Sequence, residues 1–167
     1  RPPRSTQGVS SAASDVYKRQ VYDDEDAHKK LNMTQKQWSE QKQKVEKTGW
    51  GVFCKDREIV TESGESVKCG EVENCVKCKY DRMLVSADPI SISDMIIWKA
   101  ALDNSETAFT AKNMNRWSDV WVPWQAFFTV VLEEKMTRGK LSLIKKQATE
   151  IANQKMSNSD FTMPEPW

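Results

Sequence analysis

Four cysteines that lie close together in the sequence constrain the fold of this chain more than any other feature. Cys54, Cys69, Cys75 and Cys78 follow the pattern C-x14-C-x5-C-x2-C, and the rest of the 167-residue chain holds no cysteine. Tetrahedral zinc takes four such ligands, and a C-x-x-C turn lets two thiolates reach one ion. Cys75 and Cys78 form such a turn, and Cys54 and Cys69 would complete the shell. The pattern therefore predicts a bound zinc ion with these four ligands.

Zinc held by four thiolates would stabilise the fold rather than catalyse a reaction, because a saturated shell leaves no position for a reactive water. The spacing lacks the symmetrical pair of C-x-x-C turns of a zinc ribbon, and other uses of the cluster stay open. Two disulfides would need an oxidising compartment, and a thioredoxin-like redox pair would leave two cysteines idle. An iron-sulfur cluster takes the same ligands, and free cysteines can also pack in a core.

The first twenty residues differ in kind from the rest of the chain. Residues 10–20, SSAASDVYKRQ, resemble the in-frame translation of a transposase-based sequencing-library adapter, and residues 1–6, RPPRST, resemble the flow-cell end of the same oligonucleotide. We therefore exclude residues 1–20 from fold reasoning and expect them to be disordered. The adapter runs into Val21 without an initiating methionine. We expect the remainder to be the tail of a longer protein.

The net charge identifies no partner once this segment is removed. Residues 1–20 hold Arg1, Arg4, Lys18 and Arg19 against Asp15, so the 25 basic and 24 acidic residues of the chain become 21 and 23, a net charge of −2. A nearly neutral chain has no global attraction for nucleic acid or for an anionic membrane. No apolar run is long enough to span a bilayer, so we expect no membrane partner.

Turn signals and hydrophobic periodicity predict the organisation of the remainder. Residues 21–33 are typical of an acidic linker, and residues 34–88 of a helix followed by a cysteine-rich zinc module. Residues 89–156 have helical periodicity, with the last amphipathic helix at about 141–155, and residues 157–167 form an irregular tail. The predicted fold class is mainly α, with a small cysteine-rich, zinc-knuckle-like β/loop subdomain followed by a bundle of about three to four helices.

In the cysteine-rich half, Thr34 is the expected N-cap of the first helix, which would end near Gly49. Few apolar residues would lie along one side of this helix, so it would bury little surface. Residues 50–54 and 82–87 have the apolar, β-branched character of short strands that flank the cysteine-rich insert.

In the helical half, capping and breaking residues predict the helix ends. A capping box at residues 91–94 would start one helix, and the polar residues 103–105 would break it. A long helix is expected over about residues 115–138, which Pro123 would either kink or restart. Gly139 suits the C-terminus of that helix.

No catalytic set can be assembled from these residues. His28 is the only histidine and lies in an acidic stretch, where a solvated side chain is the simpler interpretation than a general base. No phosphate-binding glycine loop and no HExxH motif occurs. Trp117, Trp121 and Trp124 recur at helical spacing, which favours a core position over a stacking platform. Lys77, Lys79 and Arg82 could touch phosphates, although a solvated mixed-charge face is the simpler interpretation.

An ordered series of short motifs resembles the C-terminal region of bacterial phage-type site-specific integrases of the tyrosine recombinase family. The series runs through Thr48-Gly49-Trp50-Gly51-Val52-Phe53-Cys54-Lys55-Asp56, Cys69…Cys75-x-x-Cys78, Asp94-x-Ile96-Ile97-Trp98, Arg116-Trp117-x-x-x-Trp121-x-Pro123-Trp124-x-Ala126-Phe127, Glu133-x-Lys135-Met136-x-Arg138-Gly139 and Pro166-Trp167. It covers about residues 31–167.

The resemblance implies site-specific DNA recombination and integration by a parent protein in the cytoplasm, with DNA and other integrase protomers as partners. Its catalytic residues cannot be carried over, because His28 is followed by Lys30 and Leu31 where the family has His-x-x-Arg, and Tyr22 and Tyr80 lack a matching context. The chain would then be a non-catalytic accessory module whose catalytic domain lay upstream of Val21. The alternative is a standalone zinc-stabilised module that binds protein or DNA.

Overall fold

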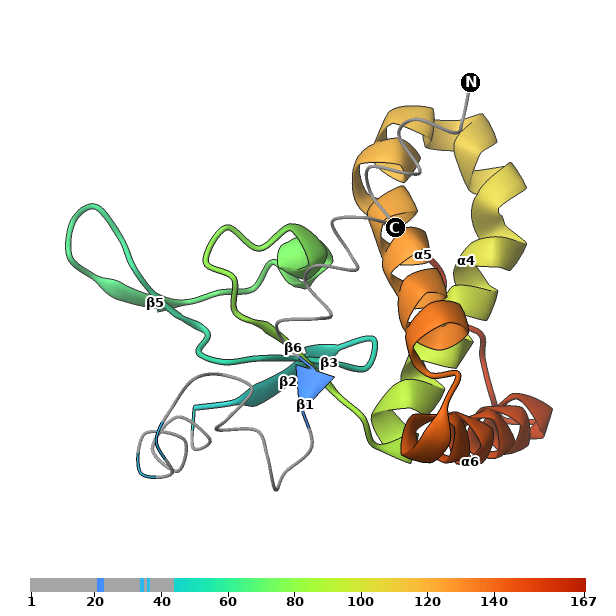
Figure 1. Ribbon diagram of the computed structural model, residues 1–167. Helices are drawn as coiled ribbons and strands as arrows, with labels where there is room; N and C mark the ends of the chain where they lie inside the picture. The colour runs from blue at the N-terminus through green and yellow to red at the C-terminus, as the bar shows by residue number, and fades with distance from the viewer. Residues whose placement is uncertain (1–20, 23–33, 35, 37–43) are drawn as a thin grey trace.

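The computed structural model describes residues 21–22, 34, 36 and 44–167. The predicted disorder of residues 1–20 and most of the predicted linker and first helix fall outside these residues. Figure 1 shows two parts, with small sheets on one side and helices on the other. The prediction of a mainly helical chain with a helix bundle after a small β region is confirmed.

A four-stranded sheet forms the centre of the β region. It consists of β1 (Val21–Tyr22), β2 (Glu46–Gly49), β3 (Val52–Cys54) and β6 (Met83–Ser86), in the order β1-β6-β3-β2. β6 pairs parallel with β1 and antiparallel with β3, which also pairs antiparallel with β2. The strands predicted within residues 50–54 and 82–87 are confirmed as β3 and β6.

Two expectations for this region are wrong. A helix does not reach Gly49, because residues 46–49 form β2, and Val21–Tyr22 form β1 rather than linker. The thin apolar stripe of the expected helix offered little to bury, whereas β2 gains a ladder with β3. Tertiary pairing has overridden a weak local signal.

The insert between β3 and β6 holds a two-stranded ribbon and a short helical turn. β4 (Glu58–Val60) and β5 (Ser66–Lys68) pair only with each other among the described strands. This ribbon extends away from the helices in Figure 1. The 3-10 helical turn η1 (Val72–Lys77) follows and lies between Cys69 and Cys78, on the side of the insert that packs against the core.

The turn between β2 and β3 brings the sheet against the helices. Gly49, Trp50 and Gly51 all have positive φ, at 144°, 56° and 84°. A Cβ atom on Gly51 would lie 2.3 Å from the main-chain oxygen of Ser91. Only glycine allows that approach. A tryptophan at φ 56° is strained, and its ring is 7 % exposed within the core, where burial offsets the strain.

The first long helix, α4 (Pro89–Arg116), begins earlier and ends later than the sequence predicts. Asp88 is the N-cap, since its carboxylate accepts hydrogen bonds from the Ser91 amide at 2.8 Å and the Ser91 hydroxyl at 2.7 Å. Residues 103–105 do not break the helix, because they lie on a partly exposed face where polar side chains are tolerated. The irregular residue is Asn113, with φ −153° and ψ 82°.

The predicted helix over residues 115–138 is largely confirmed, although its geometry is mixed. The π-helical segment η2 (Trp117–Trp121) leads into α5 (Val122–Thr129), and a second π-helical segment, η3 (Val130–Lys135), follows. Pro123 lies in the first turn of α5, so it restarts the helix. Gly139 does not end this run as predicted. With φ 55° it begins α6 (Gly139–Ser157), which confirms the last helix.

Tryptophans join the two parts in one core. Trp117, Trp121 and Trp124 are at most 2 % exposed, so the interpretation of this stripe as core is confirmed. Trp50 packs on Trp124 at 4.5 Å and on Trp98 at 5.2 Å between ring centroids. After α6, the chain is irregular, as predicted, and ends with the ring of Trp167 5.3 Å from that of Trp121.

Candidate metal centre

The four cysteines line one cavity of about 540 Å³ between the ribbon, η1 and β6. Cys54 ends β3, Cys69 follows β5, Cys75 lies in η1 and Cys78 is the residue after it. All four are partly buried free cysteines, and no disulfide joins them. One cavity is thus lined by cysteines that are up to 24 positions apart in the sequence.

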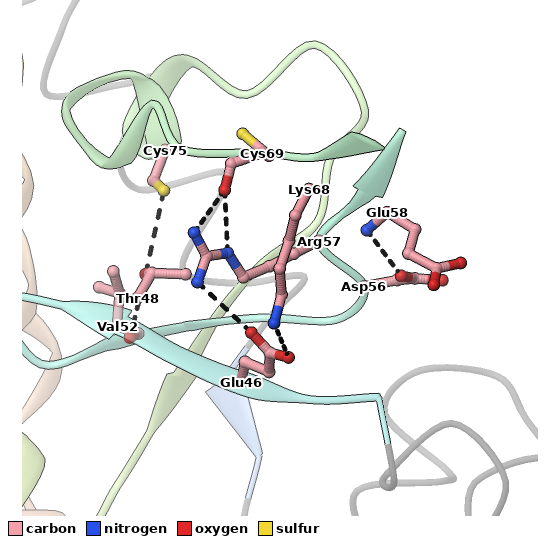
Figure 2. Close-up of polar contacts among 9 residues, drawn as sticks. All are labelled: Glu46, Thr48, Val52, Asp56, Arg57, Glu58, Lys68, Cys69 and Cys75. Carbon is pink, nitrogen blue, oxygen red and sulfur yellow. Dashed lines mark hydrogen bonds and ion pairs between the residues drawn. The ribbon is translucent and has the colours of Figure 1, made fainter. Parts of the chain in front are cut away.

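The side chains do not form a closed metal shell in this structure. Among the described residues, no group of three or more histidine, cysteine, aspartate or glutamate side chains is arranged to hold a metal ion. The expected zinc-knuckle geometry of the β/loop subdomain is therefore not supported. In Figure 2 the sulfur of Cys75 points to Thr48, whereas that of Cys69 points away from it. The Cys75 thiol lies 4.0 Å from the Thr48 hydroxyl oxygen.

Burial keeps two of these thiols protonated. It raises the pKa of Cys75 to about 11, above the ordinary 9.0, while the contact with Thr48 opposes the shift. Burial also raises the pKa of Cys54, and nearby Cys78 and Cys69 add to the increase. Reactive or redox-sensing cysteines have a lowered pKa. Burial therefore opposes a reactive thiolate at Cys75 and at Cys54, and a metal ion would have to displace their protons to bind.

An arginine fixes the loop that carries Cys69. Arg57 donates two hydrogen bonds to the main-chain oxygen of Cys69, from Nε at 3.0 Å and from a terminal nitrogen (Figure 2). The other terminal nitrogen of its guanidinium lies 3.4 Å from one carboxylate oxygen of Glu46, and Nζ of Lys68 lies 2.7 Å from the other. This charged cluster ties β2 to the start and end of the ribbon.

Main-chain hydrogen bonds shape the C-x-x-C turn. The Cys78 amide donates to the Cys75 oxygen at 3.1 Å, and the Asp81 amide donates to the Cys78 oxygen at 3.1 Å. Asp81 has φ 53°, the left-handed conformation that aspartate tolerates better than most residues. Main-chain hydrogen bonds thus close the turn that carries Cys75 and Cys78.

Sequence reasoning missed Arg57, Glu46 and Thr48 as supports of this site. Their only signal is the run of alternating charges around residue 57, which is typical of any solvated face. The basic residues considered as phosphate contacts are partly used within the fold. Arg82 donates to the main-chain oxygens of Asp56 and Glu58, and its guanidinium lies 4.9 Å from the centre of the Tyr80 ring. His28 lies outside the described residues.

Comparisons with known proteins give no relative. The chain matches no protein-family model, no curated protein and no solved structure. None of the helices among the described residues is both long and apolar enough to cross a membrane. The feature of the described residues that bears on function is the cavity lined by the four cysteines.

Proposed function

We propose that this chain is a zinc-stabilised, non-catalytic accessory module from the C-terminal region of a site-specific integrase, which acts in DNA recombination. The observation that carries the proposal is the convergence of Cys54, Cys69, Cys75 and Cys78 on one cavity. One of these cysteines ends β3 and three lie on the insert, and clustered thiols that form no disulfide are the usual ligands of structural zinc.

Metal binding at this cavity needs side-chain adjustment. Cys75 would exchange its contact with Thr48 for the ion and lose its proton, as every thiol ligand does. The hydrogen bonds from Arg57 would keep the Cys69 loop in place meanwhile. The ion would supply structural cross-linking of the insert, and four thiolates would leave it no position for a substrate.

The integrase part of the proposal is supported by where the resembling residues lie. Trp50, Trp98, Trp121, Trp124 and Trp167 come from separate motifs of the series, and their rings contact one another in a single cluster. Arg116 of the same series donates a hydrogen bond to the main-chain oxygen of Trp167. Residues from the separate motifs of the series therefore lie in one aromatic cluster. DNA and other protomers would be reached through the parent protein.

The zinc proposal is tested by the metal content of the purified full-length chain. We expect about one zinc per chain by elemental analysis, and Cys75→Ser to lower both this content and the thermal midpoint. Asn74→Ala, which changes the exposed neighbour of Cys75, is the matched control and should keep the metal. A metal-free protein in which all four thiols titrate freely, with no gain in stability on adding zinc, would overturn the assignment.

The integrase proposal is tested by the nucleotide sequence upstream of the codon for Val21. We expect an open frame that encodes the arginine, His-x-x-Arg and tyrosine set of a tyrosine recombinase. A start codon within a few codons of residue 21 would instead favour a standalone zinc-stabilised interaction module. An upstream frame without that set would contradict the integrase origin.

A further inference from the structure

The last ten residues of the chain, which we call the tail, return from the end of α6 to the tryptophan core. Residues 158–167 are irregular, and the main-chain hydrogen bonds that Asn158 and Phe161 donate stay local, to Lys155 and to Asn158. Within the described part of the chain, Trp167 supplies the tail's polar and ring contacts with the rest of the fold. The tail is therefore attached to the core mainly through its last residue.

Three tryptophan rings contact the ring of Trp167. Its centroid lies 5.3 Å from that of Trp121, 5.6 Å from that of Trp50 and 6.3 Å from that of Trp98. The rings meet it at 55° to 80°, the tilted and edge-on arrangements that aromatic pairs prefer. Trp167 nevertheless remains 53 % exposed, so this site is open to solvent on one side.

Two donors converge on the main-chain oxygen of Trp167. The indole Nε1 of Trp121 donates to it at 3.2 Å, and Nε of Arg116 donates to the same oxygen. Trp121 is fully buried, so its indole N–H needs an acceptor. These two donors and the three rings, together called the tryptophan socket, thus recognise an aromatic ring and an oxygen acceptor on one residue.

The composition of the socket is that of an interaction surface. Tryptophan and arginine are the residues most enriched at the energetic centres of protein interfaces. Arg116 and Trp98 remain partly exposed even with the tail in place. Pro164 and Pro166 restrict the tail to extended conformations before it binds, which lowers the entropy lost when Trp167 enters the socket. A segment of another protein with the same chemistry would gain the same advantage.

We propose that the tryptophan socket is a peptide-binding site, which Trp167 occupies and so blocks in the free chain. The ligand is an extended segment of a partner protein that presents a proline followed by a tryptophan, as Pro166 and Trp167 do. When the tail leaves, the socket offers three rings and two donors to that segment. The tail competes at an effective concentration on the order of millimolar, because it is tethered to α6 by a short irregular segment. The site needs neither zinc nor an integrase parent.

A labelled peptide with the sequence of residues 161–167 tests the proposal by fluorescence anisotropy. Trp167→Ala removes the competing ring, and we expect this full-length variant to bind the peptide at least tenfold more tightly than the parent chain. Phe161→Ala is the matched control, because this aromatic residue of the tail makes no ring contact among the described residues, and it should bind as weakly as the parent. A peptide with alanine in place of tryptophan should bind neither chain. A folded Trp167→Ala chain that binds the peptide no better than the parent overturns the proposal.

Indole hydrogen exchange in the parent chain, measured by NMR, tests whether the tail leaves the socket without global unfolding. The Trp121 indole is bonded to the tail, whereas the equally buried Trp124 indole donates to the main-chain oxygen of Glu73 at 2.8 Å. We expect the Trp121 indole hydrogen to exchange at least tenfold faster than that of Trp124. Equal rates that follow global unfolding would show that the tail is a fixed part of the core and would refute its displacement by a partner.

Discussion

Replacing Gly51 by alanine is expected to destabilise the fold by about 2–5 kcal/mol. The residue has φ 84°, where an L side chain costs about 1–2 kcal/mol. The new Cβ would also lie 2.3 Å from the Ser91 oxygen and 2.7 Å from Cγ of Met95. The oxygen belongs to the backbone of α4 and cannot rotate away, so the sheet and the helix must separate. Overpacking of this kind costs about 1–3 kcal/mol more.

Gly64, in the turn of the β4–β5 ribbon, offers a control with the same backbone angle. Its φ is also 84°, but a Cβ there would meet nothing within 4 Å. Gly64→Ala should therefore lose only the conformational part, about 1–2 kcal/mol. Urea unfolding followed by circular dichroism measures both variants, with unchanged slopes as the sign of a common unfolded state. Equal losses for the two variants would refute the close approach of β3 to α4.

Three further predictions concern pH, capping and packing. Hydrogen bonding from Lys68 lowers the pKa of the Glu46 carboxyl. The ionised carboxylate therefore stabilises the fold above its ordinary pKa of 4.5, and this stabilisation is lost as the pH falls through the lower folded pKa. Glu46→Gln should flatten the acid limb of the profile of stability against pH, measured by urea unfolding. Asp88→Ala removes the N-cap of α4 and should cost about 0.5–2 kcal/mol in the same assay, whereas a loss near zero would contradict the cap to Ser91. Trp50→Ala should cost about 3–5 kcal/mol, and a thermal midpoint unchanged from that of the parent chain would contradict its place in the core.

The sequence predicts helix content and core well where periodicity is strong. The stripe at Trp117, Trp121 and Trp124 is buried, and α6 lies close to where its apolar spacing predicts. Helix ends are predicted less well, because one residue type can serve either end of a helix. Gly139 suits a C-terminus by its left-handed preference, yet the same φ of 55° serves the turn that enters α6. The preceding run ends instead at Met136, whose amide donates to the Val131 oxygen.

The supports of the cysteine cavity could not be predicted from local patterns. The C-x14-C-x5-C-x2-C spacing predicts that the four cysteines share one site, and in the fold all four line one cavity. Arg57 is an ordinary surface residue by sequence, and its role depends on the position of the Cys69 oxygen in three dimensions. Glu46 was assigned to a helix, and only its place in β2 brings it within 3.4 Å of Arg57. Contacts of this kind arise from tertiary pairing, which leaves no periodic signal.

The cysteine turn and the proline-tryptophan motif look independent in the sequence and meet in the fold. Lys77 contacts the residue four positions before Pro123, and Trp124 contacts η1 from the position after it. These two hydrogen bonds run in opposite directions, one from η1 to the main chain of η2 and one from α5 to the main chain of η1, so they fix η1 against the helices from both sides.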